Sequence, residues 1–187
     1  MKKLISLLAI VSLFSCSNDD APQENHEFLN SLVSKYKLVS VDTDVPIDLN
    51  GDNISQTDLM LEADCFLFGS FALYMGEFVY KPSFDYKRFN VDVPCVYYDL
   101  ANESYTTCLV GLSLSCFYEV NEETKEIIIT GRNEEREAEF GSVTEVYWED
   151  SLIHFIVNKE LYTTNGWQEV NIHMVYQKWD FLNNVPN

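Results

Sequence analysis

The chain has 187 residues and a formal net charge of −18 at pH 7, because 30 acidic residues outnumber 12 basic ones. Such a negative surface repels nucleic acid and anionic lipid headgroups, so we expect neither as a partner. Aromatic residues make up 14% of the chain, a richness that disordered chains lack, and the length suits one domain with a substantial core.

The first 15 residues have the pattern of a bacterial export signal. Lys2 and Lys3 form a basic tip, and the apolar run over residues 4–14 is shorter than the roughly 20 residues that cross a bilayer. The sequence L-F-S-C at residues 13–16 resembles a lipobox, in which Cys16 becomes the lipidated first residue of the mature protein. The alternative is an ordinary secretory signal with an incidental cysteine.

The chain is predicted to have three parts: a lipoprotein signal peptide over residues 1–15, a lipid-anchored tether over residues 16–24 and a barrel domain over residues 25–187. The tether is polar and contains Pro22, as flexible linkers do. Acidic residues soon after Cys16 resemble the export tag of surface lipoproteins, although a plain linker can also be acidic. We therefore predict a protein anchored in the outer membrane through Cys16 and facing the cell exterior.

Residues 25–34 place apolar side chains at helical spacing and predict one short helix. A polar loop over residues 42–53 and one or two helical turns within residues 55–63 follow the first strand, and residues 131–137 form a charged loop. Strands and turns otherwise alternate at the spacing of all-β proteins. The predicted strands cover residues 35–41, 71–80, 84–98, 105–120, 126–130, 140–148, 152–162 and 167–179.

The strand over residues 105–120 has the clearest pattern, because its even positions from Cys108 to Val120 are all apolar and predict one buried face. The Asn165-Gly166 pair is a strong hairpin signal. Short connections make neighbouring strands antiparallel, and closing the sheet removes its exposed edges. We therefore predict an all-β fold, an antiparallel up-and-down barrel of about eight strands with a short N-terminal helix, in preference to an open sandwich.

The first and last strands carry a family resemblance. K-Y-K-L-V-S-V at residues 35–41 and N-I-H-M-V-Y-Q-K-W at residues 171–179 resemble the lipocalin-like lipoproteins of the Bacteroidetes, and so does the segment over residues 46–52. The family usually has a glycine and a tryptophan where this chain has Ser34 and Tyr36. The resemblance implies an eight-stranded antiparallel barrel and no particular ligand, since this fold hosts many functions.

One loop has the composition of a metal site. Asp48, Asn50 and Asp52 alternate around a glycine and resemble the first half of an EF-hand-type calcium loop, with Asp58 as the candidate that closes the site. The loop lacks the glutamate of a full EF-hand, and its glycine falls one place early. The alternative is an Asx-rich turn, in which these side chains accept hydrogen bonds from their own backbone. The sequence suggests no cofactor apart from this calcium ion.

Four cysteines follow the lipobox, and an even number in an oxidising compartment suggests two disulfides with three possible connectivities. A hairpin centred between residues 101 and 102 would place Cys95 opposite Cys108, which leaves Cys65 for Cys116. Two alternatives stay open: a kink in the second strand would upset this pairing, and some of the cysteines would then be free buried thiols.

Two histidines are candidates for a catalytic or metal-binding pair. If the last hairpin turns at residues 164–165, His154 and His173 are diagonal neighbours on one face. The opposite face is apolar and forms the core, so both histidines are predicted to point outward, where a purely structural role is the more common one. The sequence contains no recognisable catalytic motif, and we do not expect an enzyme.

Aromatic residues concentrate in two of the predicted strands, and they support two hypotheses about function. In the first, a lipid-anchored barrel binds a small apolar ligand or a glycan in its mouth. In the second, the rings fill the barrel, and the protein contacts a protein partner through its loops. The residues concerned are Phe71, Tyr74, Phe78, Tyr80, Phe84, Tyr86 and Phe89.

Overall fold

The computed structural model of the chain describes residues 26–63, 65–67 and 75–179. The helices and strands are, in order, α1 (Glu27–Leu32), β1 (Ser34–Ile47), β2 (Gln56–Asp58), α2 (Leu59–Glu62), β3 (Cys65–Leu67), β4 (Met75–Lys81), η2 (Pro82–Phe84), β5 (Tyr86–Asp99), β6 (Ser104–Asn121), β7 (Glu126–Gly131), α3 (Glu134–Phe140), β8 (Ser142–Glu149), β9 (Leu152–Thr163) and β10 (Gly166–Lys178). None of the helices in the described ranges has the length and hydrophobicity of a membrane-spanning segment.

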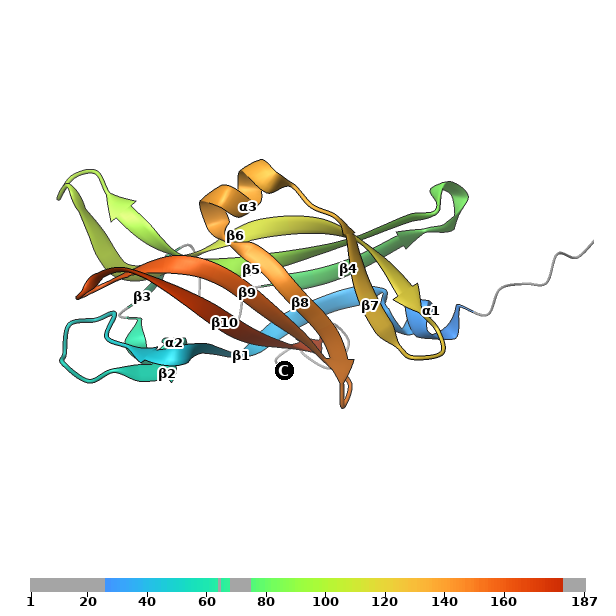
Figure 1. Cartoon of the computed structure of the whole chain (residues 1–187), viewed down its shortest axis with the longest axis horizontal. Coiled ribbons are helices and arrows are strands. Elements are labelled where there is room, and N and C mark those ends of the chain that lie inside the picture. The colour runs from blue at the N-terminus through green and yellow to red at the C-terminus, as the bar shows by residue number, and fades with distance from the viewer. Residues whose placement is uncertain (1–25, 64, 68–74, 180–187) are drawn as a thin grey trace, which may run out of the picture.

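Eight antiparallel strands form a nearly closed barrel, which confirms the predicted fold class. The hydrogen-bonded order is β7-β6-β5-β4-β1-β10-β9-β8, so the last strand returns to pair with the first. β7 and β8 stand at the two ends of this order and lie side by side across a seam, and α3 connects them (Figure 1). The short β2 pairs with β1, and β3 pairs with β6, outside the eight-stranded order.

Aromatic rings fill the interior of the barrel. Phe78 on β4 is at its centre, and its ring centroid lies 5.1 Å from that of Tyr118 and 5.4 Å from that of Phe89. Rings at such distances are in van der Waals contact, so the interior is a packed core. Six rings in this cluster are at most 1% exposed: Tyr36, Phe78, Phe89, Tyr118, Phe155 and Tyr176.

The N-terminal helix closes one end of the barrel. The backbone N–H groups of Phe28 and Leu29, at the start of α1, donate to the two carboxylate oxygens of Glu122 at 2.7 and 3.0 Å. The hydroxyl of Tyr36 donates to the carbonyl of Leu32 at 2.7 Å. A carboxylate at a helix start satisfies N–H groups that have no partner within the helix. The same contacts fix α1 against the β6–β7 connection.

The predicted charged loop over residues 131–137 is in part a helix. α3 begins after Asn133, whose side chain accepts a hydrogen bond from the backbone N–H of Arg136 at 3.1 Å. An asparagine cap followed by acidic residues in the first turn is a helix-start signal, because both complement the free N–H groups. The helix links β7 to β8 across the seam.

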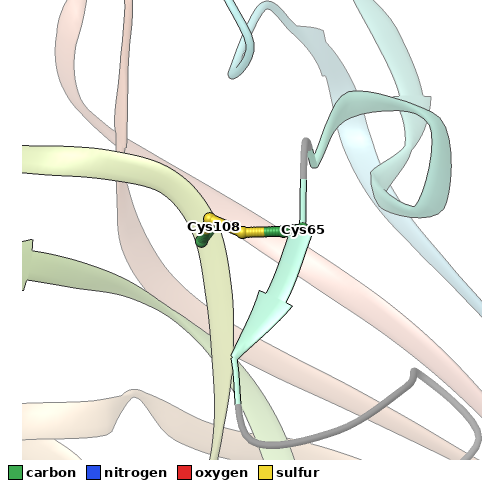
Figure 2. Close-up of a disulfide and its surroundings, with 2 residues drawn as sticks. All are labelled: Cys65 and Cys108. Atoms are coloured by element: carbon green, nitrogen blue, oxygen red, sulfur yellow. A yellow bond between two sulfur atoms is a disulfide. The ribbon is translucent and has the colours of Figure 1, made fainter.

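The structure corrects the predicted disulfides. It joins Cys65 on β3 to Cys108 on β6, with the two Cα atoms 4.5 Å apart (Figure 2). Cys95 and Cys116 are buried free thiols, which was the alternative that the sequence left open. The pairing of Cys95 with Cys108 and of Cys65 with Cys116 is therefore wrong.

The reason for this correction is a local irregularity in the β5–β6 hairpin. The turn has the predicted centre, since Tyr98 lies opposite Tyr105. Between Val96 and Tyr98 the register then shifts by two residues, and Cys95 comes to lie opposite Val110. Irregularities of this kind leave residues unpaired and change every later cross-strand partner.

Candidate functional site

Within the described residues, core side chains occupy the interior of the barrel, where the first hypothesis places a ligand. Of the aromatic residues that the sequence concentrates in two strands, Phe78 and Phe89 belong to the core. Phe84 on η2 is 82% exposed instead. Phe71 and Tyr74 lie outside the described residues. The outer surface of the barrel is therefore the better candidate for a functional site.

The side chains predicted to bind calcium accept hydrogen bonds from nearby backbone N–H groups. The two oxygens of Asp48 accept from the N–H groups of residues 51 and 53 at 2.7 and 3.2 Å. Asn50 and Asp52 each accept from the N–H two residues later, and Asp58 caps α2. No group of three or more His, Cys, Asp or Glu side chains in the described ranges is arranged to hold a metal ion. Calcium binding stays a prediction.

This loop also supports the turn of the β9–β10 hairpin. Both the backbone N–H and the hydroxyl of Thr164 donate to the carbonyl of Asp48, each at 3.1 Å. Because the Asp48 side chain holds the loop closed while its carbonyl holds the hairpin, the loop has a defined structural role. It fixes the turn of the β9–β10 hairpin.

The two predicted histidines meet on the outer face of the barrel. His154 Nδ1 lies 2.9 Å from His173 Nε2, and the ring of Tyr147 stacks on His154 with centroids 4.6 Å apart. His154 is only 8% exposed, and burial lowers its pKa, with a further contribution from His173. The neutral imidazole is therefore favoured, which suits a histidine that hydrogen-bonds its neighbour and stacks on a ring.

A cluster of exposed rings lies at the end of the barrel opposite α1. We call it the hairpin patch: Tyr98 and Tyr105 from the β5–β6 hairpin, and Tyr162 and Trp167 from the β9–β10 hairpin. In each hairpin the two rings face one another directly across the strands next to the turn. Centroid distances within the patch run from 4.7 to 5.4 Å, and each residue is 36–48% exposed.

The shape of the barrel brings these hairpins together, although they are far apart in the sequence. β7 pairs with β6 only from Phe117 onward, and β8 pairs with β9 only as far as Asn158. The remaining parts of β6 and β9 extend past β7 and β8. There the ring centroids of Tyr105 and Tyr162 lie 4.7 Å apart across the seam. Figure 1 shows both hairpins at the same end of the molecule.

An acidic groove adjoins the patch between α3 and the outer face of β9 and β10. This glutamate groove has a volume of about 390 Å³, and Trp167 lines it as well as belonging to the patch. Glu139, Glu160 and Glu169 line it and have no ion-pair partner among the described residues. Lys159 also lines the groove, but its amine points into the barrel and donates to the backbone carbonyl of Pro94.

Two of these glutamates face each other. Glu160 and Glu169 are direct cross-strand partners on the outer face of the β9–β10 hairpin. Like charges in this arrangement destabilise a sheet, and a cation between them would remove the repulsion. The side-chain amide of Asn158 donates to Glu169 at 3.0 Å and offsets part of that charge. The groove therefore favours a positively charged group beside the indole ring of Trp167.

Comparison of the chain with models of known families, with curated proteins and with solved structures found no match. The barrel that the lipocalin-like resemblance implies is present, while membership of that family stays a prediction. The lipobox and Cys16 lie outside the described residues.

Proposed function

We propose that this protein is a lipid-anchored binding module that contacts a basic protein surface through the hairpin patch and the glutamate groove. The observation that carries the proposal is the cluster of four half-exposed rings beside three glutamates that have no ion-pair partner in the part of the chain that the structure describes. The barrel, whose interior is a packed core, serves as the rigid scaffold for these two features. This is the second of the two functions that the sequence suggested, and no catalytic role is proposed.

The composition of the hairpin patch supports a protein partner. Tyrosine and tryptophan are enriched at protein interfaces, because they combine a large apolar area with a polar group and little side-chain entropy. Tyr105 touches the rings of Tyr98, Tyr162 and Trp167, which places it at the centre of the patch. Exposed rings that already support one another lose little further freedom when a partner covers them.

The charges around the patch support a partner that carries lysine or arginine. The glutamate groove starts at Trp167, so a basic side chain in it would contact both carboxylates and an aromatic face. The net charge of −18 attracts a basic surface from a distance and repels acidic ones. The proposed partner therefore presents an apolar residue to the patch and a cation to the groove.

A blocked peptide that alternates lysine and leucine is a suitable probe for this site. Replacing Tyr105 and Trp167 by alanine is expected to raise the Kd of the peptide at least about tenfold, because both rings are at the centre of the site. The matched control is Phe117→Ala, since this ring is 48% exposed on the outer face of β6 but is not part of the patch. Isothermal titration calorimetry gives the three Kd values.

Two results would contradict the proposed site. One is an equal loss of affinity in the Phe117→Ala control, which would mean that the peptide binds exposed rings without regard to place. The other is equal binding of a peptide that alternates glutamate and leucine, which would remove the role of the groove.

The membrane anchor of the proposal depends on Cys16. Replacing Cys16 by serine removes the sulfur that receives the lipid, so the variant is expected to move from the membrane fraction to the soluble fraction. Fractionation of cells that produce either form measures this, and the Phe84→Ala variant is the control because Phe84 is an exposed residue that is far from residues 1–15 in the sequence. Retention of the Cys16→Ser protein in the membrane would contradict lipid anchoring.

A further inference from the structure

Lys159 and Cys95 form a buried pair of reactive groups beneath the hairpin patch. Lys159 Nζ lies 2.8 Å from Cys95 Sγ and 2.7 Å from the carbonyl oxygen of Pro94. The two residues are 7% and 6% exposed. Lys159 belongs to β9 and Cys95 to β5, which are not neighbours in the barrel order, so the pair bridges two separate parts of the sheet.

The surroundings favour chemistry between these two groups. A thiolate is the form of cysteine that attacks peroxides, and the 2.8 Å contact lets the Cys95 thiol pass its proton directly to the Lys159 amine. Burial is the main effect on the Lys159 amine and lowers its pKa, although the Cys95 sulfur opposes this. A lowered pKa favours the neutral amine, which is the nucleophilic form of lysine. Neither residue is completely sealed from solvent, since Lys159 keeps 7% and Cys95 keeps 6% of its surface exposed, so a molecule as small as hydrogen peroxide is the oxidant considered.

We propose that Cys95 and Lys159 are a modification site, at which a peroxide joins β5 to β9 through a sulfenamide bond. In the first step the Cys95 thiolate attacks one oxygen of hydrogen peroxide and becomes a sulfenic acid. The hydroxide that leaves takes a proton from the Lys159 ammonium, which gives water and the free amine. Sulfur has then lost two electrons, and the peroxide has been reduced.

In the second step the Lys159 amine attacks the sulfur of the sulfenic acid. The S–N bond forms, the S–O bond breaks, and the departing hydroxide leaves as water with one proton from the nitrogen. Sulfenic acids are known to condense with a backbone nitrogen in this way. Here the nitrogen 2.8 Å from the Cys95 sulfur is the Lys159 amine. Two equivalents of a thiol reverse the reaction and restore both side chains, with a disulfide of the reductant as product.

Cys116 provides an internal control for this site. It is also a free, buried cysteine, but no lysine amine is within hydrogen-bonding distance among the described residues. Burial raises the pKa of its thiol to about 11, so its thiolate is scarce at neutral pH. A peroxide should therefore act on Cys95 and spare Cys116.

The test is peptide mapping of the full-length protein after treatment with hydrogen peroxide at neutral pH. Free thiols are blocked with iodoacetamide, and the chain is digested without reductant. We expect one joined pair of peptides, containing Cys95 and Lys159, with a mass about 2 Da below the sum of the two. The Cys116 peptide should be recovered alkylated, and treatment with dithiothreitol before blocking should remove the joined pair.

The Lys159→Arg variant separates this reaction from ordinary cysteine oxidation. It keeps a cation at the site but offers no amine, so we expect a Cys95 sulfenic acid that dimedone can trap, and no joined peptides. Three results would overturn the proposal: recovery of Cys95 as a free thiol in the wild type, equal oxidation of Cys95 and Cys116, or a joined pair that retains a peroxide oxygen.

Discussion

Replacing Phe78 by alanine is expected to lower the free energy of unfolding by about 3–5 kcal/mol, the usual cost of removing a buried phenylalanine ring. Phe78 is 1% exposed, and its ring contacts those of Tyr36, Phe89, Tyr118 and Phe155. The substitution removes these contacts and leaves a cavity that the surrounding strands cannot fill, because their positions are fixed by ladders on both sides. Urea denaturation followed by fluorescence measures the loss as a shift of the midpoint.

The size of this loss distinguishes a filled barrel from an open one. In an open barrel the Phe78 ring would line a solvated cavity, and its removal would cost little. The control is Phe84→Ala, where the ring is exposed and the expected change is within about 0.5 kcal/mol. A loss below about 1 kcal/mol for Phe78→Ala would mean that the interior is not packed.

Loss of the Cys65–Cys108 disulfide is the second change with a large expected effect. The bridge closes a separation of 43 residues, for which the chain-entropy relation gives about 4 kcal/mol of stabilisation. Replacing both cysteines by serine should therefore lower the free energy of unfolding by roughly that amount. Adding a reductant to the wild type should have the same effect, and denaturation curves measure both.

The double variant is its own control, because a reductant should no longer change its stability. Peptide mapping of the untreated protein gives the connectivity independently. A disulfide that includes Cys95 or Cys116 would contradict the Cys65–Cys108 bridge. So would a wild-type denaturation midpoint that does not change when a reductant is added.

Much of the fold could be predicted because it depends on local pattern. The alternation along residues 105–120 marks the buried face of β6, where Leu114, Cys116 and Tyr118 point inward. The Asn165-Gly166 turn fixes the β9–β10 hairpin. The register of this hairpin makes His154 and His173 diagonal neighbours, as predicted. Short connections then leave a meander as the simplest arrangement of the strands.

Other features depend on contacts that no local pattern reports. The shift between Val96 and Tyr98 changes the partner of Cys95, and nothing in the residues themselves marks it. Lys159 lies on the face of β9 that the sequence assigns to the core, and its burial depends on the distant carbonyl of Pro94. The hairpin patch was missed for the same reason, since its two halves meet only when the barrel closes.

The helix α3 was missed although a signal was present. Asn133 followed by glutamates at residues 134 and 135 is a recognisable helix start, but the high charge of the segment suggested a solvated loop. The correction matters for function, because α3 forms one wall of the glutamate groove.

NMR titrations with two probes show whether the interior is closed and whether binding occurs at the hairpin patch. The Met174 methyl group reports on the buried core, and the indole N–H of Trp167 reports on the patch. An apolar dye and the lysine–leucine peptide are added in separate experiments. We expect the peptide to shift the Trp167 signal and neither probe to shift the Met174 signal. A shift of the Met174 signal on addition of the dye, with the Trp167 signal unaffected by the peptide, would instead indicate an open interior and no binding at the patch.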